Sequence, residues 1–180
     1  MKTAWYYRVH LCDARARSYN VELGLSGRVA IVGGSSRGIG FAAASAIVRE
    51  GGFVTIVGRD RAALDIAAKS LRDASSPPNV LTVAADLSLP EGIHQVVSAT
   101  VDRWEHIDIV INNLGGPPPG ALLSFDDSEW QLGFDLSFSS AVRLNRIVLP
   151  EMIKQGHGRI ISILSRSIRE PEDGLALSTV

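Results

Sequence analysis

Short, almost wholly apolar runs alternate with longer Ala-rich and charged stretches from Leu25 onward, and this alternation most limits the fold. The runs predict strands at 28–33, 52–58, 79–85, 107–113 and 158–164. They are apolar throughout instead of at every second position, which is typical of parallel strands covered on both faces. The pattern therefore predicts a sheet held between two layers of helices.

The stretches between the runs predict the helices. Their composition and spacing favour helices at 38–50, 61–74, 90–104 and 128–154. The alternation of strand and helix indicates right-handed crossovers and no internal linker. We therefore expect an α/β fold, a Rossmann-type doubly wound parallel sheet in three layers (α/β/α), incomplete at about five strands.

Charge and cysteine content exclude several classes of protein. A formal net charge of −1 gives no electrostatic basis for binding nucleic acid or an anionic membrane. The apolar runs are far shorter than a bilayer span, so no membrane segment is expected. Cys12 is the sole cysteine, which argues against a disulfide framework and a Cys-type zinc site. A cytoplasmic protein is the expectation.

The first 22 residues differ in composition from the rest. They hold all three tyrosines, the cysteine and three arginines, with Asp13 and Glu22 as acids. We interpret 1–22 as a disordered N-terminal extension; a transit peptide is the alternative, although serine is scarce. Residues 23–180 form the predicted domain, a partial one of Rossmann type.

The stretch "VAIVGGSSRGIGFAAASAI" places a glycine-rich loop between a strand and a helix. Such a loop must turn tightly, admit a pyrophosphate close to its backbone, and aim amide groups at it from the helix N-terminus. Gly34, Gly38 and Gly40 suit these demands, with Ser35, Ser36 and Arg37 as donors. The loop predicts a nucleotide phosphate site.

Four ordered motifs carry a family resemblance. "GGSSRGIG" resembles the T-G-x-x-x-G-I-G loop of the short-chain dehydrogenase/reductase family, and "AADLS", "NNLGG" and "GRIISILS" resemble its later motifs. The resemblance runs from about Leu23 to Val180, and within the family the chain is similar to 3-oxoacyl-acyl-carrier-protein reductases. It implies cofactor contacts at Ile39, Asp86, Leu87, Asn112, Asn113 and Gly115, besides the loop residues above.

The end of the second predicted strand bears on which nicotinamide cofactor is bound. An acidic residue there usually holds a free ribose 2′-hydroxyl, whereas a 2′-phosphate needs cations. This chain has Gly58 and Arg59, and Arg37 is expected nearby. NADP(H) is therefore favoured over NAD(H); two solvated surface arginines are the alternative.

The resemblance implies a Ser, a Tyr and a Lys as catalytic residues, with an Asn on the long helix. Ser165 matches the Ser. Ser178 stands where the Tyr is expected, and the Lys position falls at 182, after the last residue. Asp135 or a near neighbour in "GFDLSF" stands where the Asn is expected. The usual triad is therefore incomplete in this chain.

The remaining chemistry-bearing residues give weaker signals. His94, His106 and His157 are scattered without the spacing of metal ligands, so surface or turn roles are expected and no metal is predicted. "GGPPPGALLSF" at 115–125 is either a wall of the substrate pocket or a stiff connection.

Two functional hypotheses follow. The first is an NADP(H)-dependent short-chain oxidoreductase acting on a small-molecule carbonyl or alcohol, present as a C-terminally truncated and catalytically incomplete chain. The second is a non-catalytic dinucleotide-binding or regulatory module. The fifth strand is expected at an unpaired edge, and the resemblance implies a homo-oligomer for the full-length family member.

Overall fold

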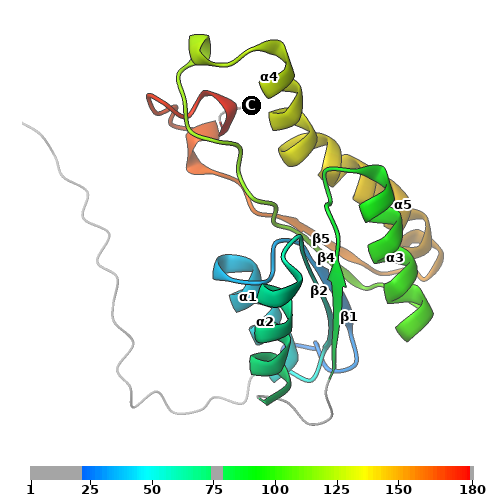
Figure 1. Cartoon of the computed structure of the whole chain (residues 1–180). Coiled ribbons are helices and arrows are strands. Elements are labelled where there is room, and N and C mark those ends of the chain that lie inside the picture. Colours follow the sequence, from blue (N-terminus) through cyan, green and yellow to red (C-terminus); the bar gives the residue numbers. More distant parts are fainter. Residues whose placement is uncertain (1–21, 74–78, 179–180) are drawn as a thin grey trace, which may run out of the picture.

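The computed structural model describes residues 22–73 and 79–178, which form a three-layer α/β/α fold (Figure 1). A single parallel sheet has the strand order β3-β2-β1-β4-β5. Its strands are β1 (Val29–Val32), β2 (Phe53–Gly58), β3 (Val80–Ala84), β4 (Ile109–Asn112) and β5 (Arg159–Ser162). The predicted fold class is confirmed, while residues 1–21 of the predicted extension lie outside the described residues.

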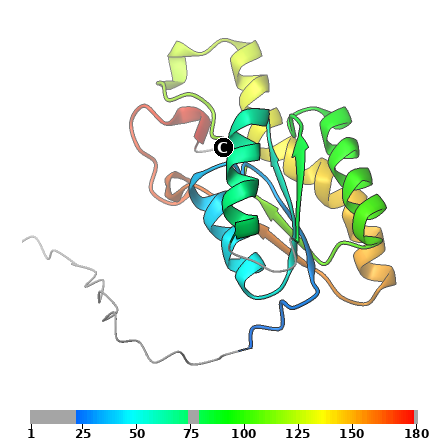
Figure 2. The same cartoon turned by 60° about the horizontal axis from the view of Figure 1, so that its bottom comes forward.

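Helices cover both faces of the sheet (Figures 1 and 2). One layer holds α1 and α2, and the other holds α3 and α5. The helices are α1 (Gly38–Arg49), α2 (Arg61–Asp73), α3 (Pro90–Trp104), α4 (Asp127–Phe134) and α5 (Ser140–Lys154). The predicted order of elements is therefore found, with most boundaries moved by one or two residues.

The central strand β1 shows why its run is wholly apolar. Successive side chains of a strand point to opposite faces. Ala30 and Val32 pack with the α1 and α2 cluster, and Ile31 packs with the α3 and α5 cluster. All four β1 side chains are buried, because each face of this strand is covered.

Strand β5 departs from this pattern. It pairs with β4 alone among the described strands, and all four of its residues are exposed. Ile161 is 47% accessible. The expectation that β5 lies at an edge is confirmed, whereas coverage of both its faces, predicted from its composition, is wrong for the described residues.

The helix predicted at 128–154 is not continuous. A π-helical turn at Asp135–Ser139 separates α4 from α5. The Ser137 hydroxyl donates to the Gly133 carbonyl at 2.6 Å, and the Ser140 hydroxyl donates to the Leu136 carbonyl at 2.7 Å. Serine hydroxyls that bond to carbonyls four residues earlier compete with the helical ladder. The serines around this turn are the physical reason for the break.

Residues 166–178 return to the loop that follows β4. The Gly120 amide donates to the Gly174 carbonyl at 2.6 Å, and the Ala176 amide donates to the Gly120 carbonyl at 3.2 Å. Leu177 is buried against Gly133 of α4. The described chain ends in a short 3₁₀ turn at Ala176–Ser178, and residues 179–180 lie outside the described residues.

Candidate functional site

Two adjoining cavities lie at the carboxyl ends of the strands, where ligands of open α/β sheets bind. The first, of about 440 Å³, is bounded by the β1–α1 loop and the ends of β2 and β3. The second, of about 560 Å³, is bounded by α5, the residues after β5 and the 3₁₀ turn. Residues 113–116 line both, so one loop forms their common wall.

The β1–α1 loop has the close backbone packing that a phosphate loop requires. Gly34 has φ +54°, and a Cβ there would overlap the Asn113 carbonyl oxygen. A Cβ on Gly40 would lie 2.5 Å from the Gly34 carbonyl oxygen. Gly38 has φ +61° with open space around it. Gly34 and Gly40 therefore pack closely against their neighbours, whereas Gly38 has open space around it and does not line either cavity.

The loop residues expected to be phosphate donors or cofactor contacts divide into two groups. Ser36, Arg37 and Ile39 line the first cavity. Ser35 is wholly buried: its hydroxyl donates to the Val32 carbonyl at 2.6 Å and accepts the Val57 amide at 2.8 Å. The Ser35 side chain therefore ties the loop to β2 and faces away from the cavity.

Asn113 clamps the loop from the end of β4. Its side-chain amide donates to the Gly33 carbonyl at 3.1 Å and to the Gly34 carbonyl at 3.3 Å. Asn113 also lines both cavities. It therefore fixes the turn of the β1–α1 loop relative to the common wall.

Two arginines stand at the first cavity without a protein partner. Arg37 and Arg59 line it, and among the described residues neither guanidinium forms a hydrogen bond or an ion pair. Asp60 also lines the cavity, but its Oδ1 accepts the Ala63 amide at 3.1 Å, as expected for the N-cap of α2. The cavity therefore offers unsatisfied cationic donors beside the end of β2.

Asp86 and Leu87 line the same cavity from the end of β3. Partial burial opposes the charge on Asp86. Hydrogen bonds from the Ser88 hydroxyl and amide, at 2.7 and 2.9 Å, together with the Arg59 charge, outweigh it and lower the Asp86 pKa. Asp86 is therefore a charged hydrogen-bond acceptor at the cavity wall.

The second cavity brings together the two serines predicted as catalytic. Ser165 and Ser178 both line it. Ser167, buried between them, has its hydroxyl 2.7 Å from the Ser165 hydroxyl and donates to the Ser178 carbonyl at 2.9 Å. The Ser167 amide also donates to Ser165 Oγ at 3.2 Å. Ser167, which the sequence did not single out, therefore holds the two segments together.

Asp135 lies apart from the residues that line the two cavities. Its carboxylate accepts the Gln131 amide at 3.2 Å and the Arg143 guanidinium at 2.9 Å, and these bonds lower its pKa. Ser137, its near neighbour in "GFDLSF", lines the second cavity instead. The family's Asn was expected at Asp135 or a near neighbour. Of the polar residues in that segment, Ser137 is the one that lines the second cavity.

Two further polar residues of the second cavity were missed. The buried Asn112 side chain donates to Asn145 Oδ1 at 3.0 Å and to Ser162 Oγ at 3.4 Å. Asn145 and Ser162 both line the cavity. Asn145 lies in a stretch predicted to be helical. The one sequence feature that could have indicated it is its polar side chain next to the apolar Leu144.

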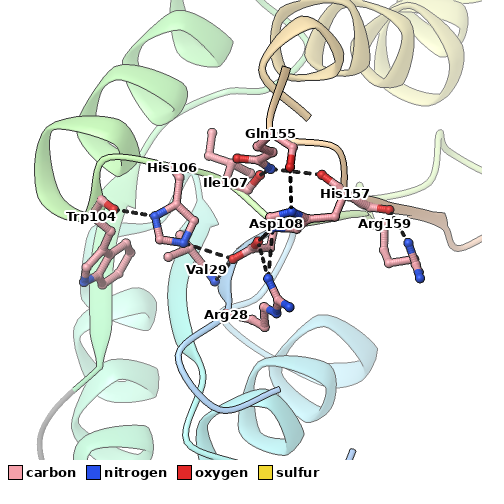
Figure 3. A network of polar contacts seen from close by, with 10 residues as sticks. Arg28, Val29, Trp104, His106, Ile107, Asp108, Gln155, His157 and Arg159 are labelled. Atoms are coloured by element: carbon pink, nitrogen blue, oxygen red, sulfur yellow. Dashed lines mark hydrogen bonds and ion pairs between the residues drawn. The ribbon is translucent and has the colours of Figure 1, made fainter. Parts of the chain in front are cut away.

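The amino ends of the strands hold a polar cluster that local spacing did not predict (Figure 3). Buried Asp108 accepts the Val29 amide at 2.8 Å and the Arg28 guanidinium at 3.1 Å. His106 and His157 both reach its carboxylate with Nε2. His94, His106 and His157 are all exposed, as expected for surface or turn residues, and the latter two each bond to a carbonyl two residues earlier. Their ion pairs with Asp108 are an additional role that the sequence did not predict.

The environment of Asp108 favours its charged form. Burial opposes the charge, but the Val29 amide, His157, His106 and Arg28 outweigh it and lower the Asp108 pKa.

Residues 22–73 and 79–178 contain no group of three or more acidic, histidine or cysteine side chains placed to hold a metal ion. Over the same ranges, no helix is long and apolar enough to cross a membrane.

Comparison with known proteins gives consistent matches. The family model described as "short chain dehydrogenase" matches residues 28–177. The chain is 33% identical over 156 residues to the uncharacterized oxidoreductase YvaG of Bacillus subtilis, covering 87% of this chain and 58% of that protein. It is 31% identical over 141 residues to the 3-oxoacyl-[acyl-carrier-protein] reductase FabG of Vibrio cholerae, covering 78% and 56%. The chain thus spans less than two thirds of these relatives.

Solved structures agree with this match. L-sorbose reductase from Gluconobacter frateurii, complexed with NADPH and L-sorbose, superposes with a TM-score of 0.81 at 34% identity, covering 86% of this chain and 59% of that one. Other structures of similar fold are complexed with NADH or NAD.

Proposed function

The chain belongs to the short-chain dehydrogenase/reductase family, and on that premise we propose that residues 23–180 are the cofactor-binding part of an NADP(H)-dependent oxidoreductase. The reaction would interconvert a carbonyl and an alcohol. The observation that carries the proposal is a close-packed glycine loop at the same cavity as Arg37 and Arg59, whose guanidiniums form no hydrogen bond or ion pair among the described residues.

The preference for NADP(H) follows from charge. A ribose 2′-phosphate carries a negative charge that needs cationic donors, and Arg presents a planar fork of N–H groups to it. Arg59 follows β2, where an acid would otherwise accept a ribose hydroxyl. Asp60 accepts a helix amide, whereas neither guanidinium forms a hydrogen bond among the described residues, so the two arginines are the cationic groups able to donate to a phosphate here.

The proposed cofactor contacts follow the placement of the residues. Gly34, Gly38 and Gly40 would admit the pyrophosphate, and Ser36, Arg37 and Ile39 would line its path. Asp86 and Leu87 would lie at the adenine side. Asn112, Asn113 and Gly115 would lie at the nicotinamide side. Ser35 belongs to this set as the residue that holds the loop to β2.

Bound NADPH would supply a hydride to a carbonyl carbon, and a proton must reach the carbonyl oxygen to complete the alcohol. Ser165, which lines the second cavity, would hold that oxygen with its hydroxyl. Ser178 would stand where the family has its acid, but a serine hydroxyl is a far weaker acid than a tyrosine phenol. Residues 22–178 would therefore orient a substrate better than they protonate it.

This weakness supports a second candidate function, a dinucleotide-binding module without turnover. The observation in its favour is that the Ser165 hydroxyl already bonds to Ser167, with no tyrosine or lysine in the cavity lining. In either case we propose a small-molecule partner, a cytoplasmic location and, for the whole protein, a homo-oligomer.

A titration tests the cofactor proposal. Purified chain is titrated with NADPH and with NADH while intrinsic fluorescence is followed, and we expect saturation with NADPH at the lower concentration. Arg59→Ala should weaken NADPH binding by roughly 10- to 100-fold, the value of a charge-assisted bond, and leave NADH binding nearly unchanged. Tighter binding of NADH than of NADPH by the unaltered chain would overturn the preference.

Arg61→Ala is the matched control. Arg61 is the first residue of α2 and is exposed, but it pairs with Asp65 on the same helix and lies outside the cavity lining. Its removal should change neither titration. An equal loss from both variants would mean that general surface charge, not a phosphate contact, attracts the cofactor.

A further inference from the structure

We infer that the second cavity takes an uncharged ketone or secondary alcohol with an apolar body, and that it rejects anionic substrates. The inference rests on the proposed function, which places the reacting carbonyl in this cavity. Among the described residues, those that line the cavity include no aspartate, glutamate, histidine, lysine, arginine, cysteine or tyrosine. The adjoining first cavity, by contrast, includes two arginines and two aspartates.

The polar atoms of the second cavity are neutral. Asn112, Asn145 and Ser162 form one hydrogen-bonded group, and Ser165 with Ser167 and Ser178 forms another. Amides and hydroxyls of this kind can bond to a carbonyl or hydroxyl oxygen without bringing in a net charge. They suit a substrate with one such oxygen.

The rest of the cavity wall is apolar and open to a ligand. Phe138 and Leu164 are 62% and 67% accessible, and Val142 and Ile168 also remain exposed. Large apolar side chains that converge on a cavity while still exposed to water gain stability when a ligand covers them. The apolar share of the wall therefore favours a hydrocarbon body over a heavily hydroxylated one.

The four arginines next to wall residues in the sequence (143, 146, 166 and 169) all lie outside the cavity lining, and two of them are paired. Arg143 of α5 bonds to Asp135 and to the Ser88 carbonyl. Arg166 pairs with Glu170 and Glu172. A carboxylate or phosphate entering the cavity would lose water without gaining a counter-charge, which is unfavourable. The cavity therefore discriminates by charge.

A matched ligand pair tests this inference. The full chain is saturated with 1,4,5,6-tetrahydro-NADP, whose uncharged nicotinamide ring transfers no hydride and adds no positive charge beside the cavity. It is then titrated with methyl 4-oxocyclohexanecarboxylate and with 4-oxocyclohexanecarboxylate, followed by ligand-observed NMR. These ketones share a ring and differ by one charge. We expect the ester to bind at least about 10-fold more tightly, a difference of about 1.4 kcal/mol. Equal or tighter binding of the acid would overturn the inference.

A third ligand separates the two parts of the inference. L-sorbose is a neutral ketose with many hydroxyls, and we expect weaker binding than for the ester. Tighter binding of the sugar would overturn the apolar body. Fluorescence reports tetrahydro-NADP binding separately, so a chain that binds tetrahydro-NADP but not the ester contradicts this inference alone, whereas failure to bind tetrahydro-NADP contradicts the proposed function.

A charge introduced into the wall provides the decisive variant. Val142→Lys places an ammonium group at an exposed lining position of α5, and we expect it to reverse the preference so that the acid binds at least about 10-fold more tightly than the ester. Ile153→Lys is the control, because Ile153 is an exposed apolar residue of the same helix outside the cavity. Circular dichroism checks that both variants fold. No gain of acid binding in the folded Val142→Lys chain would overturn the assignment of the cavity.

Discussion

Polar side chains differ in their hydrogen bonding between the amino ends of the strands, here called the amino edge of the sheet, and the carboxyl ends, here called the carboxyl edge. At the amino edge, Asp108 is buried and its carboxylate is surrounded by donors from the backbone, an arginine and two histidines (Figure 3). At the carboxyl edge, Arg37 and Arg59 face a cavity with no partner among the described residues. A saturated cluster stabilises the fold, whereas unsatisfied donors leave bonding capacity for a ligand. The difference assigns stability to one edge and binding to the other.

The largest effect is expected at the saturated edge. Asp108→Asn removes the buried charge that pairs with the partly exposed Arg28, His106 and His157, and we expect a loss of about 3 kcal/mol, the upper end for hydrogen bonds to a charged group. Urea denaturation should show this loss, while the folded fraction keeps its NADPH affinity. Asp102→Asn, at an exposed position of α3, serves as the control and should change stability little. A loss of NADPH affinity in folded Asp108→Asn would contradict the separation of the two edges.

The second effect concerns the carboxyl edge. Gly34→Ala places a Cβ at φ +54° and against the Asn113 carbonyl, so the loop must shift. We expect about 2 kcal/mol of lost NADPH binding, roughly 30-fold, measured by fluorescence titration. Gly156→Ala is the matched control, because Gly156 also has positive φ, +74°, but open space around it and a position outside both cavities. It should lose stability from backbone strain and keep the unaltered affinity.

The two edges also differ in how far the sequence predicts them. Apolar runs and glycine spacing identify β1, its loop and α1, because strand burial and left-handed turns restrict residue type locally. Asp108 and His157 are 49 residues apart, and they meet because Ile109 pairs with Arg159 in the register of β4 and β5. No local pattern contains that register, so the cluster was missed.

Within the candidate site, local patterns identify residue type better than orientation. "GSSRG" correctly predicts a loop at the cavity, yet Ser35 and Ser36 are neighbours with opposite roles, one bonded into β2 and one lining the cavity. The π-helical turn changes which side chains face the second cavity, so Ser137 lines it and Asp135 does not. A uniform helix predicted from periodicity cannot show that shift.

A smaller effect is expected where a neutral polar group is buried at the carboxyl edge. Asn145→Ala removes the 3.0 Å acceptor of the Asn112 amide, and an unsatisfied buried donor costs about 1–3 kcal/mol. The weaker 3.4 Å bond to Ser162 remains, so we expect about 1 kcal/mol in urea denaturation. Asn145→Asp keeps an acceptor oxygen at this position and should retain more stability than the alanine variant. If both variants lose the same stability, the hydrogen bond does not stabilise the fold.

The smallest effect compares one carboxylate from each edge through pH. The pKa values of Asp108 and Asp86 are both lowered in the folded chain. A carboxyl group of this kind stabilises the fold above its unfolded pKa, near 3.9, and that contribution is lost as the pH falls through the lower folded pKa. Unfolding free energy should therefore decrease below about pH 4.

The decrease in unfolding free energy at low pH should be larger for the carboxylate at the amino edge than for the one at the carboxyl edge. Asp108 is 2% accessible and has donors from three other side chains, whereas Asp86 is only half-buried and has Ser88 as its sole side-chain hydrogen-bond donor. We expect Asp108→Asn to remove more of the acid-induced loss than Asp86→Asn, measured as urea unfolding at about pH 5 and about pH 3 on either side of the aspartate range. Water screens the charge at the open edge, so its protonation changes the folding equilibrium less. Equal changes from the two variants would mean that the carboxyl edge holds its charge as firmly as the amino edge, and the contrast between binding and stability would then rest on the unpaired arginines alone.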